Sequence, residues 1–226
     1  MTSPSRSQPQ PGPVVVLVSG GVESGCLVAH LLGRGRTVWP VYVRGGLRWE
    51  ASELRSAGRW LLTLGAPRLR PLSVVEAPAR ALYGRHWSVT GRGVPGAASP
   101  DAAVYLPGRN VLLLGSAAIY AAQQGVSRLA VGTLAGNPFG DASRGFFSRF
   151  SRCLGEALAV PMRIEAPFHQ MTKSQVIAAH AALPFHLTWS CLRPAGPRQC
   201  GRCNKCAERR RAFQRARVPD PTVYAG

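Results

Sequence analysis

Apolar residues along the chain alternate between short β-branched runs and longer stretches in which they recur every three or four positions. The run over 14–18 is wholly apolar, which is typical of a strand buried on both faces of a sheet. Further strands are predicted over 37–43, 70–75, 129–133 and 162–166, and helices over 23–32, 50–64, 110–124, 146–159 and 174–182. This order predicts an α/β fold, a Rossmann-like parallel sheet with helices on both faces.

Two irregular segments, 77–108 and 134–144, interrupt this alternation. The first is rich in Gly, Pro and Ser, and loops of this length in a small domain are usually lids or binding loops. His86 and Trp87 lie within it. Each has two interpretations, contact with a bound substrate or packing within the loop.

Composition divides the chain into three parts. Residues 1–13 are polar and proline-rich and predict a disordered tail, 14–190 carry the alternating pattern, and 191–226 form a small module rich in Cys, Arg and Gly. No apolar run is long enough to span a membrane, and the tail lacks the apolar centre of a secretory signal. We therefore expect a cytoplasmic protein.

The charge balance is strongly basic, with 28 Lys and Arg against 10 Asp and Glu, a formal net charge of +18. Such a balance favours anionic partners such as nucleotides or nucleic acid. Most of the arginines are scattered, however, so a solvated basic surface explains the charge equally well and a nucleic-acid partner is not required. Subunit pairing leaves no local signature, and a homodimer stays open.

A glycine turn directly follows the first predicted strand and opens the first helix: Ser19, Gly20, Gly21, Val22, Glu23 and Ser24. Paired glycines let backbone N–H groups approach an anion, and the positive end of a helix favours negative charge there. The serine hydroxyls can donate hydrogen bonds, and Glu23 is a candidate to hold Mg²⁺. An ordinary turn is the alternative, but this place in the order of elements favours a nucleotide-binding site.

Four of the six cysteines form a cluster in the sequence: Cys191, Cys200, Cys203 and Cys206. A cytosolic chain keeps its thiols reduced, so disulfides are a poor explanation. Four thiolates at this spacing can surround one Zn²⁺, and because they leave no open coordination position the metal would be structural. An iron–sulfur cluster remains the alternative. The remaining two, Cys26 and Cys153, are expected to be core thiols.

The glycine turn resembles the S-G-G-x-D-S pattern of the PP-loop ATP pyrophosphatases, with Glu23 at the aspartate position. Joined to the four cysteines, it is similar to the 7-cyano-7-deazaguanine synthase family. The likeness runs over about residues 14–213 and includes the motifs LPGRN, VGT, MTKSQVI and CGRCNKC in that order.

The resemblance implies an ATP-dependent carbon–nitrogen ligase that uses ATP, Mg²⁺ and Zn²⁺. It would convert 7-carboxy-7-deazaguanine and ammonia to 7-cyano-7-deazaguanine, through an acyl-adenylate and then an amide. We expect Lys173, Arg109 and Glu23 to act in catalysis, with Lys173 as the cation for departing pyrophosphate. Asn110 and Asp141 are the candidate substrate contacts, although Asp141 could instead cap the next helix.

The chain departs from the family pattern after the second strand. Leu47 and Trp49 fall where the family usually carries Gln and His, and only Glu50 or Glu53 could supply the acid that follows. Two alternatives therefore stay open. One is a related PP-loop adenylating enzyme that makes an amide, modifies tRNA or uses another carboxylate. The other is a non-catalytic zinc-knuckle protein that binds nucleic acid.

Overall fold

The structure, a computed structural model, describes residues 12–226, so the predicted tail lies outside the described residues except for Gly12 and Pro13. Among the described residues, five parallel strands form one sheet in the order β3-β2-β1-β4-β5. The strands span Val14–Leu17 (β1), Val38–Arg44 (β2), Ser73–Glu76 (β3), Arg128–Ala130 (β4) and Arg163–Glu165 (β5). The predicted parallel sheet is confirmed.

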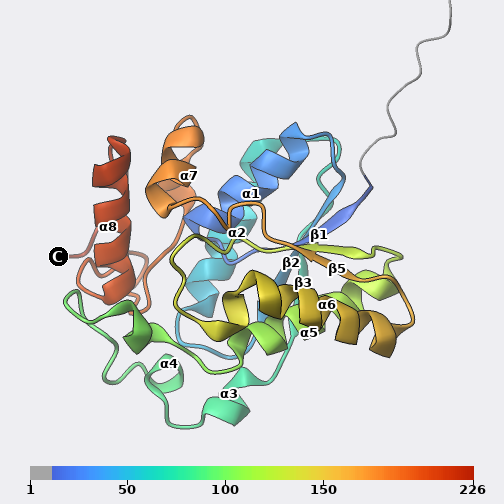
Figure 1. Cartoon of the computed structure of the whole chain (residues 1–226). Coiled ribbons are helices and arrows are strands. Elements are labelled where there is room, and N and C mark those ends of the chain that lie inside the picture. The colour runs from blue at the N-terminus through green and yellow to red at the C-terminus, as the bar shows by residue number, and fades with distance from the viewer. Residues whose placement is uncertain (1–11) are drawn as a thin grey trace, which may run out of the picture.

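Helices cover both faces of the sheet, as predicted (Figure 1). One face packs against α1 (Val22–Gly33) and α2 (Glu50–Leu64), and α7 (Lys173–Ala179) and α8 (Asn204–Ala216) extend that core. The other face packs against α5 (Arg109–Gln123) and α6 (Arg144–Leu158). Alternate residues of β1 enter the two cores, Val14 and Val16 on one side and Val15 and Leu17 on the other, which explains why the whole strand is apolar.

Helix α5 contacts the sheet through small side chains. Ala117, Ala118 and Ala121 are fully buried, together with Leu114. A side chain that is a single methyl group lets the helix axis lie close to the strands. The position of the first residue of α5, Arg109, is therefore fixed by close contact along the length of the helix.

The long segment 77–108 contains more regular structure than predicted: two short helices, α3 (Ala79–Tyr83) and α4 (Trp87–Thr90), and the 3-10 turn η1 (Asp101–Val104). Further 3-10 turns are η2 (Gly140–Ala142) and η3 (Phe185–Leu187). Helix α8, in the cysteine- and arginine-rich module, was not predicted either. Short helices without a clear apolar period are hard to recognise in a sequence.

Burial confirms one of the two predicted core thiols. Cys26, a residue of α1, is fully buried, and burial raises the pKa of its thiol. Cys153 is exposed, so that prediction was wrong. The apolar stripe of α6 runs through Phe147 and Leu154, and Cys153 lies off it. Over residues 12–226, no helix is both long and apolar enough to cross a membrane.

Candidate active site

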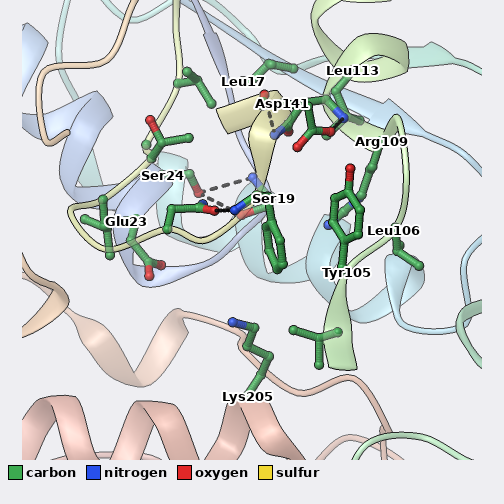
Figure 2. Close-up of a pocket in the computed structure, with 18 of the residues that line it drawn as sticks. Leu17, Ser19, Glu23, Ser24, Tyr105, Leu106, Arg109, Leu113, Asp141 and Lys205 are labelled. Atoms are coloured by element: carbon green, nitrogen blue, oxygen red, sulfur yellow. Dashed lines mark hydrogen bonds between the residues drawn. The ribbon is translucent and has the colours of Figure 1, made fainter. Parts of the chain in front are cut away.

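A cavity of about 390 Å³ opens where β1, β2 and β4 end (Figure 2). Starting from the central strand β1, the chain adds β2 and then β3 toward one edge of the sheet. It then reverses direction and adds β4 and β5 toward the other edge. Open α/β sheets bind ligands at such a reversal, outside the carboxyl ends of the strands. The cavity volume lies within the range of small-molecule sites, about 300–1,000 Å³.

The predicted glycine turn forms one wall of this cavity, through Ser19, Glu23 and Ser24. Ser19 and Ser24 lie 3.2 Å apart between their Oγ atoms, and the Ser24 Oγ also accepts a hydrogen bond from the Ser19 backbone N–H at 3.1 Å. Gly21 precedes α1 and no side chain caps the helix there. The first N–H groups of α1 have no partner within the helix and can receive an anion.

Gly20 explains why the turn needs glycine. Its φ is +69°, and a Cβ built there would collide with the backbone oxygen of Glu53. A side chain at this position is therefore strained by both its backbone conformation and its neighbour. Gly132, after β4, likewise lies so close to Glu23 that a Cβ would approach the Glu23 Cβ to 3.2 Å.

The Glu23 carboxylate belongs to a chain of ion pairs. Lys173 Nζ lies 2.8 Å from Glu23 Oε1 and 2.6 Å from Glu208 Oε1, and Glu208 Oε2 pairs with Lys205. Burial alone would lower the pKa of Lys173, but the two carboxylates outweigh it and raise that pKa. Lys173 is thus a buried, charged group held behind Glu23, whereas Glu23, Glu208 and Lys205 line the cavity.

Arg109 lies at the first turn of α5 and lines the cavity opposite the glycine turn (Figure 2). Its guanidinium carbon lies 6.0 Å from the centre of the Trp49 ring. Its Nε is buried and has no hydrogen-bond partner among residues 12–226. A buried donor without a partner is costly, so this group is suited to receive an acceptor from a bound molecule.

Asn110 and Asp141, the two predicted substrate contacts, bond to each other. Asn110 donates from its backbone N–H to Asp141 Oδ2 at 3.2 Å, and from its side-chain amide to the Asp141 carbonyl at 3.1 Å. Asp141 therefore caps α5. The expected alternative, a cap on the next helix, was wrong, because Ser143 caps α6 by accepting from the Phe146 N–H. Within the part of the chain that the structure describes, the second carboxylate oxygen, Oδ1, is buried without a hydrogen-bond partner.

The structure separates the two acids that follow β2. Glu50 is turned inward and accepts from the backbone N–H groups of Gly45 and Gly46 at 2.8 and 2.7 Å. Glu53 lines the cavity and accepts from the Tyr42 hydroxyl at 2.9 Å. Burial raises the pKa of Glu53 to about 7, although Arg109 and the Tyr42 hydrogen bond oppose the rise. Glu53 can thus exchange a proton near neutral pH.

Aromatic residues form the remaining cavity wall. Trp49 is buried and stacks on Trp87 with 5.7 Å between ring centres, and both line the cavity. Leu47 is buried beside them and does not reach the cavity. His86 does not line the cavity; its ring accepts from the Ser88 N–H at the start of α4, the packing role that the sequence also allowed.

The four clustered cysteines come together as predicted. All four are buried, and their sulfur atoms lie within 4.8 Å of one another. Backbone N–H groups of Cys200 and Cys203 donate to the sulfurs of Cys191 and Cys200 at 3.2 and 3.3 Å, and hydrogen bonds from Cys191 and Cys206 lower the pKa of Cys203. Four buried sulfurs at this spacing fit a tetrahedral metal ion.

The cysteine module is joined to the cavity wall. The four cysteines share a hydrophobic cluster with Trp49, Val104 and Leu106. The Asn204 side chain donates to the Ser99 carbonyl at 2.8 Å. Arg209, which is fully buried, donates to the Phe185 carbonyl and the Thr188 hydroxyl at 3.0 and 2.7 Å. The predicted division at residue 190 remains a prediction.

Sequence reasoning missed several cavity residues. Tyr42, Tyr105 and Glu208 belong to no motif, and Lys205 lies within the CGRCNKC motif but was not predicted as a site residue. Tyr105 stacks on Phe139 across two loops, with 4.7 Å between ring centres. One signal was present: Lys205 and Glu208 stand three residues apart, a spacing at which ion pairs form on a helix.

Comparison with known proteins shows to which family the chain is related. The family described as "Queuosine biosynthesis protein QueC" matches residues 13–217. A relative from Anaeromyxobacter dehalogenans (strain 2CP-C), named 7-cyano-7-deazaguanine synthase, is 33% identical, and the alignment covers 93% of this chain and 95% of that protein. A relative of the same name from Methanothrix thermoacetophila is 31% identical, with 94% and 99% covered.

A solved structure described as a 4-thiouridine synthetase–RNA complex with bound ATP is similar in fold, with a TM-score of 0.50 and 16% sequence identity. The match covers 91% of this chain and 50% of that one. This likeness concerns the fold alone and agrees with the predicted PP-loop type of sheet. Because the family match spans nearly all of the described residues, the chain belongs to the family of the queuosine biosynthesis protein QueC.

Proposed function

We propose that this protein is an ATP-dependent ligase that converts 7-carboxy-7-deazaguanine and ammonia to 7-cyano-7-deazaguanine in the cytoplasm. The observation that carries the proposal is the glycine turn of residues 19–24, which opens α1 at the mouth of the 390 Å³ cavity. Relatives aligned over more than nine-tenths of the chain are named for this synthesis.

The proposed reaction has two activations. A carboxylate oxygen of the substrate attacks the α-phosphorus of ATP, and pyrophosphate leaves. Ammonia then attacks the acyl carbon, AMP leaves, and the amide remains after loss of a proton. The amide oxygen attacks a second ATP, pyrophosphate leaves again, and loss of AMP and the remaining amide protons yields the nitrile.

The glycine turn is suited to the phosphates. The first N–H groups of α1, at Val22 and Glu23, and the Ser19 and Ser24 hydroxyls supply donors without added net charge. Magnesium bound with ATP needs only one or two carboxylates from a protein, and Glu23 is the candidate on this wall. Lys173, 2.8 Å from Glu23 and outside the lining of the cavity as described for residues 12–226, is suited to position the Glu23 carboxylate rather than to contact the departing pyrophosphate directly.

The opposite side of the cavity is suited to the base and its carboxylate. A deazaguanine ring presents N–H donors on one edge, and Glu53 and the free oxygen of Asp141 are acceptors for them. Arg109 offers its unpaired Nε to the carboxylate, and Asn110 holds Asp141 in place. Because the pKa of Glu53 is about 7, it can also accept a proton as ammonia adds.

The cysteine cluster is proposed to hold Zn²⁺ through Cys191, Cys200, Cys203 and Cys206. Four sulfur ligands leave no place for substrate, so the ion would supply folding stability rather than chemistry. The cluster would then keep the segment around Leu192 and Lys205 against the cavity.

The test uses purified protein with ATP, Mg²⁺, ammonium and 7-carboxy-7-deazaguanine. We expect release of AMP and pyrophosphate that depends on the carboxylate, and mass spectrometry should detect the nitrile. Ser24→Ala should slow AMP release, whereas Ser143→Ala, which alters a cap outside the cavity, should not. Absence of carboxylate-dependent AMP from the wild-type protein would refute the proposal.

One observation favours a second candidate. Trp49, one of the two residues that depart from the family pattern, makes an aromatic wall with Trp87 next to Glu53. A PP-loop enzyme that stops at the amide, or that activates another carboxylate, fits such a wall. The same mass-spectrometry experiment distinguishes the two, because it resolves acid, amide and nitrile.

A further inference from the structure

We infer that Lys205, a residue of the cysteine module, contacts the phosphates of the bound nucleotide. The inference rests on the proposed function, since it assigns the nucleoside triphosphate a second anchoring point in the same cavity. Lys205 reaches this cavity from the first turn of α8, far along the chain from the glycine turn.

The charge of the cavity lining is the first argument. Among the described residues, five acidic side chains line it: Glu23, Glu53, Asp101, Asp141 and Glu208. In the described part of the chain, only Arg109 and Lys205 bring positive charge to this lining. A triphosphate carries several negative charges, so its binding here depends strongly on each cation.

The position of Lys205 is the second argument. Direct ion pairs lead from Glu23 to Lys173, from Lys173 to Glu208, and from Glu208 to Lys205. Lys205 is therefore tied to the end of the cavity where the glycine turn lies. Figure 2 shows its side chain extended from the α8 side toward the space between Glu23 and Tyr105.

The attachment of Lys205 is the third argument. It stands between Cys203 and Cys206, two of the four clustered cysteines, and next to the fully buried Asn204. Its backbone is thus fixed by the cluster, and Glu208 orients its ammonium group. The side chain keeps 29% of its surface exposed, which leaves room for a contact with a phosphate.

A simpler role for Lys205 would be to offset the charge of metal-bound thiolates. The structure gives the sulfurs other partners, namely the backbone N–H groups of Leu192, Arg193, Cys200 and Cys203. The ammonium group of Lys205 pairs with Glu208 instead. The two roles predict different effects of removing Lys205. If it contacts phosphate, the protein loses affinity for the nucleotide; if it offsets the thiolate charge, the protein loses metal.

The experiment measures binding of ATP and of pyrophosphate by calorimetry, with the full chain in its metal-loaded form. Lys205→Met should weaken both by about tenfold or more, the loss of one charge-assisted contact. Lys205→Arg should restore most of the affinity. Arg202→Met, which removes an exposed cation of the same module outside the cavity, should change neither.

Metal content and thermal unfolding are measured on the same samples. Unchanged metal and stability with weakened ATP binding are the expected result. Equal ATP affinity in Lys205→Met and the wild-type protein, or loss of metal in place of affinity, would overturn the inference and leave the proposed function standing. A wild-type protein that binds no ATP overturns both, whereas ATP binding without carboxylate-dependent AMP overturns only the proposed substrate.

Discussion

The two sides of the cavity are built in opposite ways. The glycine-turn side comes from six consecutive residues, 19–24, and its donors are main-chain N–H groups and two hydroxyls. The other side is made of side chains from separate segments, among them Glu53 of α2, Arg109 of α5 and Asp141 of η2. A contiguous, main-chain site depends on local conformation, whereas a dispersed one depends on the whole fold.

The largest effect should come from the metal cluster, because it holds part of the dispersed side in place. Cys200→Ser should lose the metal and lower the melting temperature by more than about 10 °C. Metal analysis and calorimetric unfolding are the measurements. Cys153→Ser, at an exposed cysteine, is the matched control and should behave as the wild-type protein. Retained metal and an unchanged melting temperature in Cys200→Ser would contradict a structural role.

Gly20→Ala should disrupt the conformation of the glycine turn and so remove nucleotide binding by the contiguous side. The added methyl group is strained at φ +69° and meets the Glu53 backbone, which should cost about 3 kcal/mol and reduce AMP release to background. Gly58→Ala is the control, since a Cβ there meets nothing within 4 Å in α2 and should stabilise the helix by about 0.5–1 kcal/mol. Normal ATP binding in Gly20→Ala would show that the turn does not need glycine.

Asp141→Asn tests whether the dispersed side acts on the carboxylate substrate alone. The amide oxygen can still accept from the Asn110 N–H and preserve the cap on α5, so stability should change little. The kcat/KM for the carboxylate should fall about 10- to 100-fold, as for loss of a charged hydrogen bond. The ATP dissociation constant should stay within twofold, and a larger change would mean that the two sides are not separable.

Glu53 should affect the pH dependence of stability. Its pKa is about 7 in the folded protein against an ordinary 4.5, so between these values the folded state binds more protons and stability falls as pH rises. Over this pH range the free energy of unfolding should fall by about 3 kcal/mol because of Glu53. Urea unfolding measures this. From pH 5 to pH 8, the free energy of unfolding of Glu53→Gln should rise relative to that of the wild-type protein by this amount.

Glu156→Gln, at an exposed acid, is the control for that comparison and should follow the wild-type protein at both pH values. Parallel stabilities of Glu53→Gln and the wild-type protein would mean that the Glu53 carboxyl titrates normally, and its proposed role as a proton acceptor near neutral pH would lose its support.

The contrast between the two sides also explains what the sequence could predict. The glycine turn and the cysteine cluster are local patterns whose residue types carry their chemistry, and the apolar runs predicted the parallel sheet. Glu53 and Glu50 look alike in the sequence. Only the fold shows that Glu50 is used to hold Gly45 and Gly46, while Glu53 faces the cavity. Lys205 and Glu208 became site residues only because α8 folds back beside α7 (Figure 1).

The buried alanines of α5 carry a consequence for how this protein can vary. Ala117, Ala118 and Ala121 have no exposed surface, so a larger side chain at any of them must lift the helix from the strands. Arg109, the first residue of the same helix, would be displaced with it. Substitutions on the buried face of α5 would therefore change substrate preference, although the substituted side chains contact no bound molecule.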